Sequence, residues 1–199
     1  MQKLPINREN TTGPLIILAL SCMMYLSEPS SSEQFAYSRD AIENMELWRL
    51  LSGQLLHTNV FHFLLNGAGI LLLWGLHGDY YKTGGYLLFV LFSALFIAIS
   101  LYCFSPHLHS YVGLSGVLHA LFTYGAYQDA RQGFKSGWWL QLGVALKVLY
   151  EQWQGPDESI SKLIDANVAI DAHLFGWIAG IVVIVASRIP SPKQNGPSE

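Results

Sequence analysis

Charged residues are scarce in this sequence. Asp, Glu, Lys and Arg make up 13% of its 199 residues, whereas an average soluble domain has about 25%. Hydrophobic residues reach 51%, and the mean hydropathy is +0.31. A soluble fold of this length would have to bury more apolar surface than one small domain can enclose. The composition therefore argues against an ordinary soluble domain and favours a lipid bilayer as the solvent.

Cysteine is scarce, and there is no excess of basic charge. The two cysteines, Cys22 and Cys103, both lie in apolar stretches and provide no disulfide framework. The net charge is −3, so the sequence offers no basic patch for nucleic acid. We therefore expect neither a small secreted disulfide-rich protein nor a nucleic-acid-binding protein.

Six apolar segments come close to the roughly 20 residues that cross a ~30 Å hydrocarbon core. We expect residues 1–199 to form one all-α integral membrane domain, a bundle of six transmembrane helices. The first segment has an alternative interpretation, because a basic start before a short apolar run also describes a cleaved signal peptide. The expected spans are 11–27, 56–76, 84–104, 111–127, 137–153 and 168–187.

The positions of Lys and Arg predict the orientation of these spans, because cytoplasmic loops carry an excess of both residues. If the N-terminus is cytoplasmic, the outer segments contain only Arg39, Arg49 and Lys162. We therefore expect both termini in the cytoplasm. The inner segments then contain Lys3, Arg8, Lys82, Arg131, Lys135, Arg188 and Lys193.

Polar side chains gather near the beginnings of the second, fourth and sixth segments, although each is costly in hydrocarbon. These three segments run in the same direction, and His62, Ser115 and His173 each lie roughly 5–6 residues into them. They therefore share one depth, on the order of 8 Å below the outer surface. A serine and histidines at one depth provide the groups for nucleophilic acyl transfer. The polar side chains near the three beginnings are His57, His62 and Asn66, then Ser115 and His119, and finally Asp171 and His173.

Small residues with four-residue spacing would allow the fourth and sixth helices to approach closely. Plain helix packing is an alternative interpretation, but it does not explain why Ser115 and His173 begin these small-residue faces. The faces consist of Gly113, Gly116 and Ala120, and of Ala172, Gly176 and Gly180.

These motifs resemble those of the rhomboid family of intramembrane serine proteases. The resemblance covers residues 14–187 and rests on four motifs in the family's order. They are Trp48-Arg49 in the first outer loop, His57, His62 and Asn66 as H-x4-H-x3-N, Gly113-Leu114-Ser115-Gly116 as G-x-S-G, and Ala172-His173 with Gly176 and Gly180 as A-H-x-x-G-x-x-x-G.

Within that family, the small size and residues 113–119 (GLSGVLH) are most similar to the rhombosortase branch of Gram-negative bacteria. The resemblance implies a protease of the inner membrane whose active site opens to the periplasm. Its substrates would be membrane-anchored proteins with a C-terminal GlyGly-CTERM tail, which has a Gly-rich motif, a hydrophobic helix and a basic end. It implies no metal or organic cofactor.

The resemblance also implies a role for each residue. Ser115 is expected to be the nucleophile and His173 the general base and acid, while His62, Asn66 and the Ser115 backbone N–H bind the oxyanion. The residues expected to support them are His57, His119, Gly113, Gly116, Gly176 and Gly180.

His119 stands where many rhomboids have Tyr, so it remains an alternative base. Its approach to the Ser115 hydroxyl is constrained, because both residues lie on one helix, a turn apart. No third acid is required, and Asp171 lies about 200° around the helix from His173.

Other titratable residues are expected to have less specific roles. His107 and His109 have the spacing of a chelating pair, but two ligands make no metal site. Lys147 and Glu151, four residues apart, are expected to neutralise each other near the outer interface, and a proton relay is the alternative.

Two further functional classes remain open. A catalytically inactive rhomboid-like binding protein or chaperone would be expected to have lost either the serine or the histidine. A channel or transporter would be expected to place its polar residues along a path through the membrane rather than in one layer.

Overall fold

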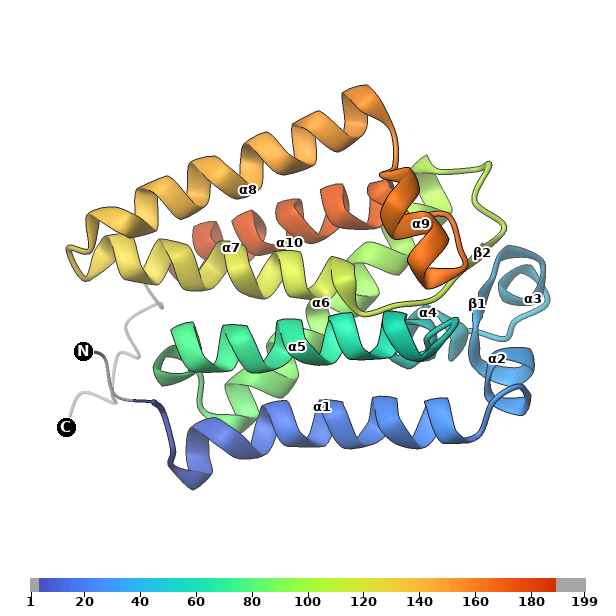
Figure 1. The fold of residues 1–199 in the computed structure, drawn as a ribbon, viewed down its shortest axis with the longest axis horizontal. Coiled ribbons are helices and arrows are strands. Elements are labelled where there is room, and N and C mark those ends of the chain that lie inside the picture. The colour runs from blue at the N-terminus through green and yellow to red at the C-terminus, as the bar shows by residue number, and fades with distance from the viewer. Residues whose placement is uncertain (1–3, 189–199) are drawn as a thin grey trace, which may run out of the picture.

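Six long helices form the body of the protein, one in each apolar segment. The computed structural model describes residues 4–188, so Lys3 and Lys193, used above for orientation, lie outside the described residues. The helices run along one common direction, with α8 and α1 at opposite edges of the bundle (Figure 1). They are α1 (Arg8–Leu26), α5 (Val60–His77), α6 (Thr83–Phe104), α7 (Ser115–Arg131), α8 (Lys135–Gln154) and α10 (Ile170–Arg188).

Three of these helices are long and apolar enough to cross a membrane. They lie in Val60–Tyr80, Thr83–Phe104 and Ile170–Arg188. The other three are more polar or shorter: α1 starts with Arg8 and Glu9, α7 has 17 residues, and α8 contains Lys147 and Glu151. The described residues thus contain a helix for each expected span, and three of the six have the length and hydropathy of a membrane span.

Large apolar side chains cover the outside of the bundle. Leu72 is 61% exposed and Leu88 67% exposed, on two neighbouring helices in the chain. A soluble monomer rarely exposes such extended apolar surface, whereas hydrocarbon solvates it without cost. Further exposed residues of this kind are Leu64, Leu65, Leu71, Leu91, Trp139, Leu146 and Leu149.

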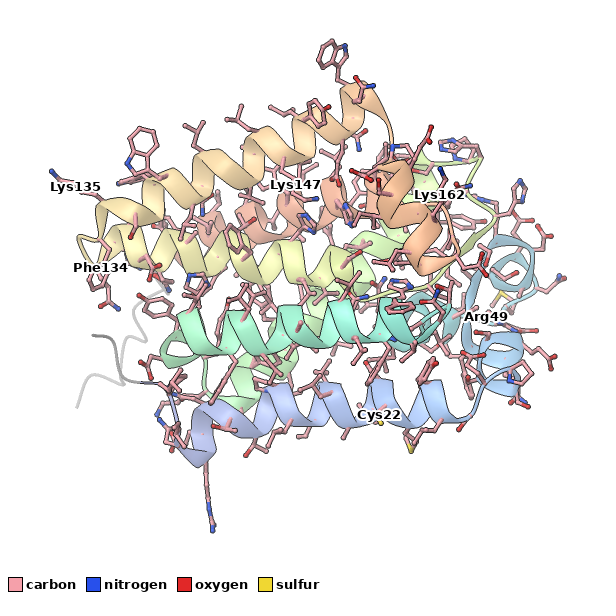
Figure 2. The ribbon with its side chains drawn as sticks, in the orientation of Figure 1. Cys22, Arg49, Phe134, Lys135, Lys147 and Lys162 are labelled. Atoms are coloured by element: carbon pink, nitrogen blue, oxygen red, sulfur yellow. The ribbon has the colours of Figure 1, made fainter. Side chains whose placement is uncertain are left out.

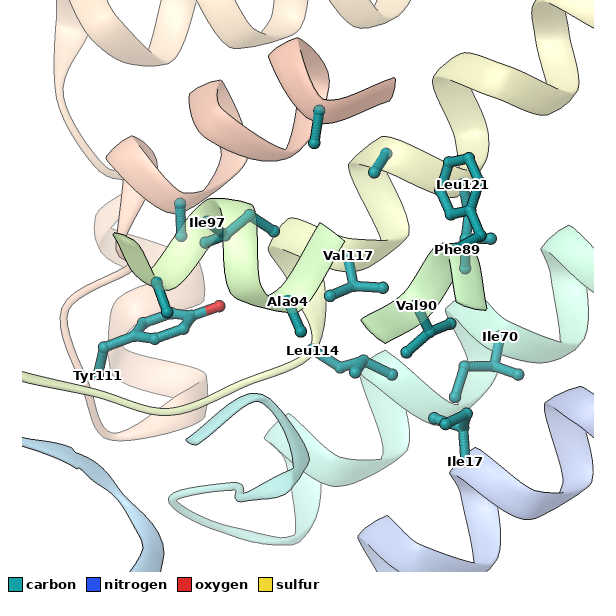
Figure 3. Packing of buried hydrophobic residues seen from close by; sticks show 14 of the residues in the cluster. Ile17, Ile70, Phe89, Val90, Ala94, Ile97, Tyr111, Leu114, Val117 and Leu121 are labelled. Carbon is teal, nitrogen blue, oxygen red and sulfur yellow. The ribbon is translucent and has the colours of Figure 1, made fainter. Parts of the chain in front are cut away.

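The core surrounds α6, which contacts α1, α7 and α10. Val90, Ala94 and Ile97 of α6 are buried among side chains from α1, α5 and α7, including Ile17 and Val117 (Figure 3). In lipid, helix association depends on close packing rather than on removing apolar surface from water. Small residues at helix contacts therefore carry much of the specificity of this fold.

Short elements gather at the end of the bundle where α5, α7 and α10 begin (Figure 1). The two β-strands pair antiparallel, with Tyr37 opposite Tyr111. This pairing is a small departure from the expected all-α fold. The elements are α2 (Ser30–Phe35), β1 (Tyr37–Ser38), α3 (Arg39–Glu43), α4 (Arg49–Ser52), the 3-10 turn Gly53–Leu55, β2 (Ser110–Tyr111) and α9 (Glu158–Ile164). A second 3-10 turn, Gly78–Tyr80, follows α5 at the opposite end.

The Trp48-Arg49 motif holds this end together. The buried Arg49 guanidinium donates to the carbonyl oxygens of Ala36 and Glu33, each at 2.9 Å, and pairs with Glu46 at 2.6 Å. The Trp48 indole N–H donates to the Gln34 carbonyl at 3.1 Å. These bonds satisfy backbone carbonyls that no helix or strand satisfies, and they fix the segment that precedes α5.

Candidate active site

Ser115 and His173 lie in hydrogen-bond contact at the beginnings of α7 and α10. His173 Nε2 is 2.8 Å from Ser115 Oγ. The α7 helix begins at Ser115, not near residue 111 as expected, because Ser110 and Tyr111 pair with β1. Ser115 is therefore the first helical residue, and its backbone N–H has no carbonyl partner within the helix. Ser115 thus carries both a side-chain hydroxyl and a backbone N–H that is not bonded within the helix.

Glycines bring these two helices into backbone contact. A methyl group on Gly176 would overlap with the Gly116 carbonyl oxygen, and one on Gly116 would lie 2.8 Å from the Ala172 carbonyl oxygen. One on Gly180 would lie 2.8 Å from the Ala120 carbonyl oxygen. No other residue type fits at these positions without moving the helices apart, and His173 would move with α10.

His62 and Asn66 of α5 lie beside the segment that leads into Ser115. Gly113 has φ +123°, which favours glycine, and a methyl group there would lie 2.7 Å from His62 Nε2. The Asn66 amide nitrogen lies 4.0 Å from the same methyl position and donates to the His62 carbonyl at 3.2 Å. Gly113 therefore lets the Ser115 segment pass directly against both side chains.

Thr58 holds the Nδ1 side of the His62 ring. The Thr58 hydroxyl donates to the Ile164 carbonyl, and its oxygen lies 3.1 Å from His62 Nδ1. The Thr58 backbone N–H points at the same nitrogen from 3.4 Å. These contacts leave Nε2 facing Gly113, and the ring donates there in the tautomer that carries its proton on Nε2. This arrangement suits a donor for developing negative charge.

A cleft of about 300 Å³ opens onto Ser115 and His62. Its other walls come from residues 108–112 and from the connection between α9 and α10. The Asn59 amide donates to the Leu163 carbonyl at 2.9 Å and fastens α9 beside this cleft. The volume is enough for several water molecules or for a short extended peptide segment.

His119 does not contact the Ser115 hydroxyl. Its Nδ1 lies 2.8 Å from the Ser115 carbonyl oxygen, one turn back along α7. Its ring stacks on that of His173, with ring centroids 4.2 Å apart and planes 23° apart. His57 lies edge-on to His62 at 5.0 Å, and neither of its ring nitrogens has a hydrogen-bond partner among residues 4–188.

Glu151 is a residue at this site that the sequence argument missed. It forms the expected pair with Lys147, whose Nζ lies 2.7 Å from Oε1. Its other oxygen, Oε2, lies 3.0 Å from Nδ1 of His173. An ionisable residue within an apolar segment is itself a signal of function. In the sequence, however, pairing with Lys147 is enough to account for Glu151.

His119, Glu151 and His173 also have potential metal-ligand atoms within 4.8 Å of one another. The geometry favours hydrogen bonding over metal binding. Both nitrogens of His173 already have partners, and the lone pairs of stacked rings run side by side rather than toward one point.

The remaining candidates lie away from the Ser115 hydroxyl. Asp171 accepts from the Ser105 hydroxyl at 2.5 Å and lies 3.7 Å from the exposed His107 ring, so it does not orient His173. The His109 backbone carbonyl accepts from the Arg39 N–H. The structure thus gives His107 and His109 different partners.

The fold and the apolar surface describe a mostly helical membrane protein with a serine–histidine pair at one end of the bundle. Residues 44–188 match the Rhomboid domain, which is most of the chain. The protein therefore belongs to the rhomboid family, a family of intramembrane serine proteases. No curated protein matches the sequence.

Proposed function

We propose that this protein is an intramembrane serine protease with Ser115 as nucleophile and His173 as general base. The observation that carries the proposal is the 2.8 Å contact between His173 Nε2 and Ser115 Oγ beside an open cleft. A hydroxyl is a weak nucleophile unless a base in contact takes its proton. Membership of the rhomboid family supports the same chemistry.

In this mechanism, His173 Nε2 takes the proton of Ser115 Oγ while Oγ forms a bond to the scissile carbonyl carbon. The His62 Nε2–H, the Asn66 amide and the Ser115 backbone N–H stabilise the resulting oxyanion. The protonated His173 then gives its proton to the leaving amine as the C–N bond breaks. Water from the cleft resolves the acyl-enzyme with the same base.

The proposed substrates are membrane-anchored proteins with a GlyGly-CTERM tail, as in the rhombosortase branch. A peptide bond within a helix has its carbonyl in the hydrogen-bond ladder, so glycines near the cleavage point make it easier to expose. An apolar cavity of about 470 Å³ lies between α5, α7 and α8, with Leu72, Phe122 and Val144 in its wall. This cavity would accept part of a hydrophobic tail.

We further propose that all six long helices span a bacterial inner membrane, with both termini in the cytoplasm and the cleft open to the periplasm. The beginnings of α5, α7 and α10 share one end of the bundle (Figure 1). The scarcity of Lys and Arg in the connectors at that end supports this orientation.

The experiment is to co-express a GlyGly-tailed protein with wild type or with Ser115→Ala. The size of the tailed protein is then measured on a gel. We expect wild type to shorten the protein and Ser115→Ala to leave it intact. Equal processing by both would disprove the protease assignment. If the tailed protein co-purifies with wild type but is never cleaved, the inactive binding protein or chaperone is the better description.

A further inference from the structure

We propose that Glu151 is a positioning residue that converts the serine–histidine pair into a Ser115–His173–Glu151 triad. This inference rests on the proposed protease function. It adds to the expectation from sequence, in which no acid is required.

The hydrogen bonds of His173 use its two nitrogens in the way a triad requires. Nδ1 lies 3.0 Å from Glu151 Oε2, and Nε2 lies 2.8 Å from Ser115 Oγ. A carboxylate only accepts, so Nδ1 carries the proton and Nε2 is left with the lone pair that receives the hydroxyl proton. Glu151 thus selects the tautomer that is active as a base.

Glu151 is itself held in place by Lys147. The ammonium group contacts Oε1 at 2.7 Å and leaves Oε2 for the histidine. The Glu151 side chain is 16% exposed and that of Lys147 50% exposed. Lys147 lies midway along α8 (Figure 2), where one turn separates it from Glu151. This pair keeps a carboxylate charged and fixed beside the ring.

The other ionisable groups around His173 do not take this role. His119 stacks on the ring face and directs Nδ1 to the Ser115 carbonyl. Asp171, two residues from His173, accepts from Ser105 instead. Among the described residues, Glu151 provides the carboxylate within hydrogen-bond distance of the His173 ring.

Glu151 would act in two ways during the reaction. It holds the ring so that Nε2 points at the hydroxyl, and its charge stabilises the imidazolium that forms when the serine proton is taken. Both effects belong to the transition state rather than to substrate binding. Removing the charge should therefore lower kcat with little change in KM.

The test compares purified wild type with Glu151→Gln, Glu151→Asp and Lys147→Gln on a GlyGly-tailed substrate. We expect Glu151→Gln to lower kcat by about 10²-fold or more, because a neutral amide neither selects the tautomer nor stabilises the imidazolium. Glu151→Asp should recover part of the rate because it keeps the charge. Lys147→Gln should lose less than Glu151→Gln because the carboxylate remains.

Glu158→Gln is the matched control. Glu158 forms the same i,i+4 pair with Lys162, but both side chains are exposed, and it has no contact with His173. Wild-type kcat in Glu151→Gln would overturn the inference. Equal losses in Glu151→Gln and Glu151→Asp, accompanied by a lower unfolding temperature, would also overturn it, because they indicate a structural role. Cleavage by Ser115→Ala would instead disprove the proposed function.

Discussion

Residues 4–188 contain two buried histidine–carboxylate pairs, one at each end of the bundle. His173 pairs with Glu151 at 3.0 Å, and His77 at the end of α5 pairs with Asp129 at 3.2 Å. The side chains of both histidines are almost fully buried. A histidine–acid pair alone therefore does not distinguish the two ends.

The two ends differ in the third partner and in the space beside it. The second nitrogen of His173 meets the Ser115 hydroxyl on a cleft of about 300 Å³. The Nδ1 of His77 has no partner within residues 4–188, and the cavity next to it holds about 10 Å³. A serine hydroxyl and an adjoining cleft therefore distinguish the candidate active site from the pair of His77 and Asp129.

Replacing each histidine with alanine should give the largest difference between the two ends. We expect His173→Ala to lower kcat by about 10⁴-fold or more, because the serine loses its base. His77→Ala should keep kcat in the folded protein but cost about 1–3 kcal/mol of stability, because Asp129 loses a buried partner. Cleavage assays with thermal unfolding measure both effects. A comparable loss of kcat in His77→Ala would contradict the distinction.

Removing the oxyanion donors should have the next largest effect. His62→Ala and Asn66→Ala are each expected to lower kcat by about 10²- to 10³-fold and to leave activity above that of Ser115→Ala. KM should change little, because these donors act on charge that develops in the transition state. Steady-state kinetics separates the two constants. An effect confined to KM would assign these residues to substrate binding.

Two glycines that contact histidines give a smaller, matched test. A methyl group on Gly113 would lie 2.7 Å from His62 Nε2, and one on Gly125 would overlap with the His77 ring. We expect Gly113→Ala to lower kcat about tenfold by displacing an oxyanion donor, and Gly125→Ala to cost about 1–3 kcal/mol of stability by overpacking. Steady-state kinetics measures kcat and thermal unfolding measures stability for both variants. Equal losses of kcat and of stability in the two variants would argue against a catalytic role for His62 and a structural role for His77.

The helices were largely predictable from the sequence. Each of the six apolar segments contains a long helix, because long apolar runs need internal hydrogen bonds in lipid. The start of α7 was misplaced by four residues because Tyr111 pairs with Tyr37, which is remote in the chain. Such a pairing leaves no periodic signal in either segment.

The site was predictable only in part. The motifs singled out Ser115, His173, His62 and Asn66, and the structure brings all four to one end of the bundle. Glu151 was missed because it lies 22 residues from His173 along the chain, on a different helix. Its pairing with Lys147 was visible at i,i+4 spacing, whereas its approach to His173 depends on how α8 packs against α10.

The most direct test of the central claim is covalent labelling of the purified protein with a fluorophosphonate, followed by identification of the modified residue. The reagent reacts with a serine hydroxyl that a neighbouring base has activated. We predict one adduct, on Ser115, which is retained in His119→Tyr and lost in His173→Ala. Labelling that persists in His173→Ala and disappears in His119→Tyr, or that falls on another residue, would contradict the account.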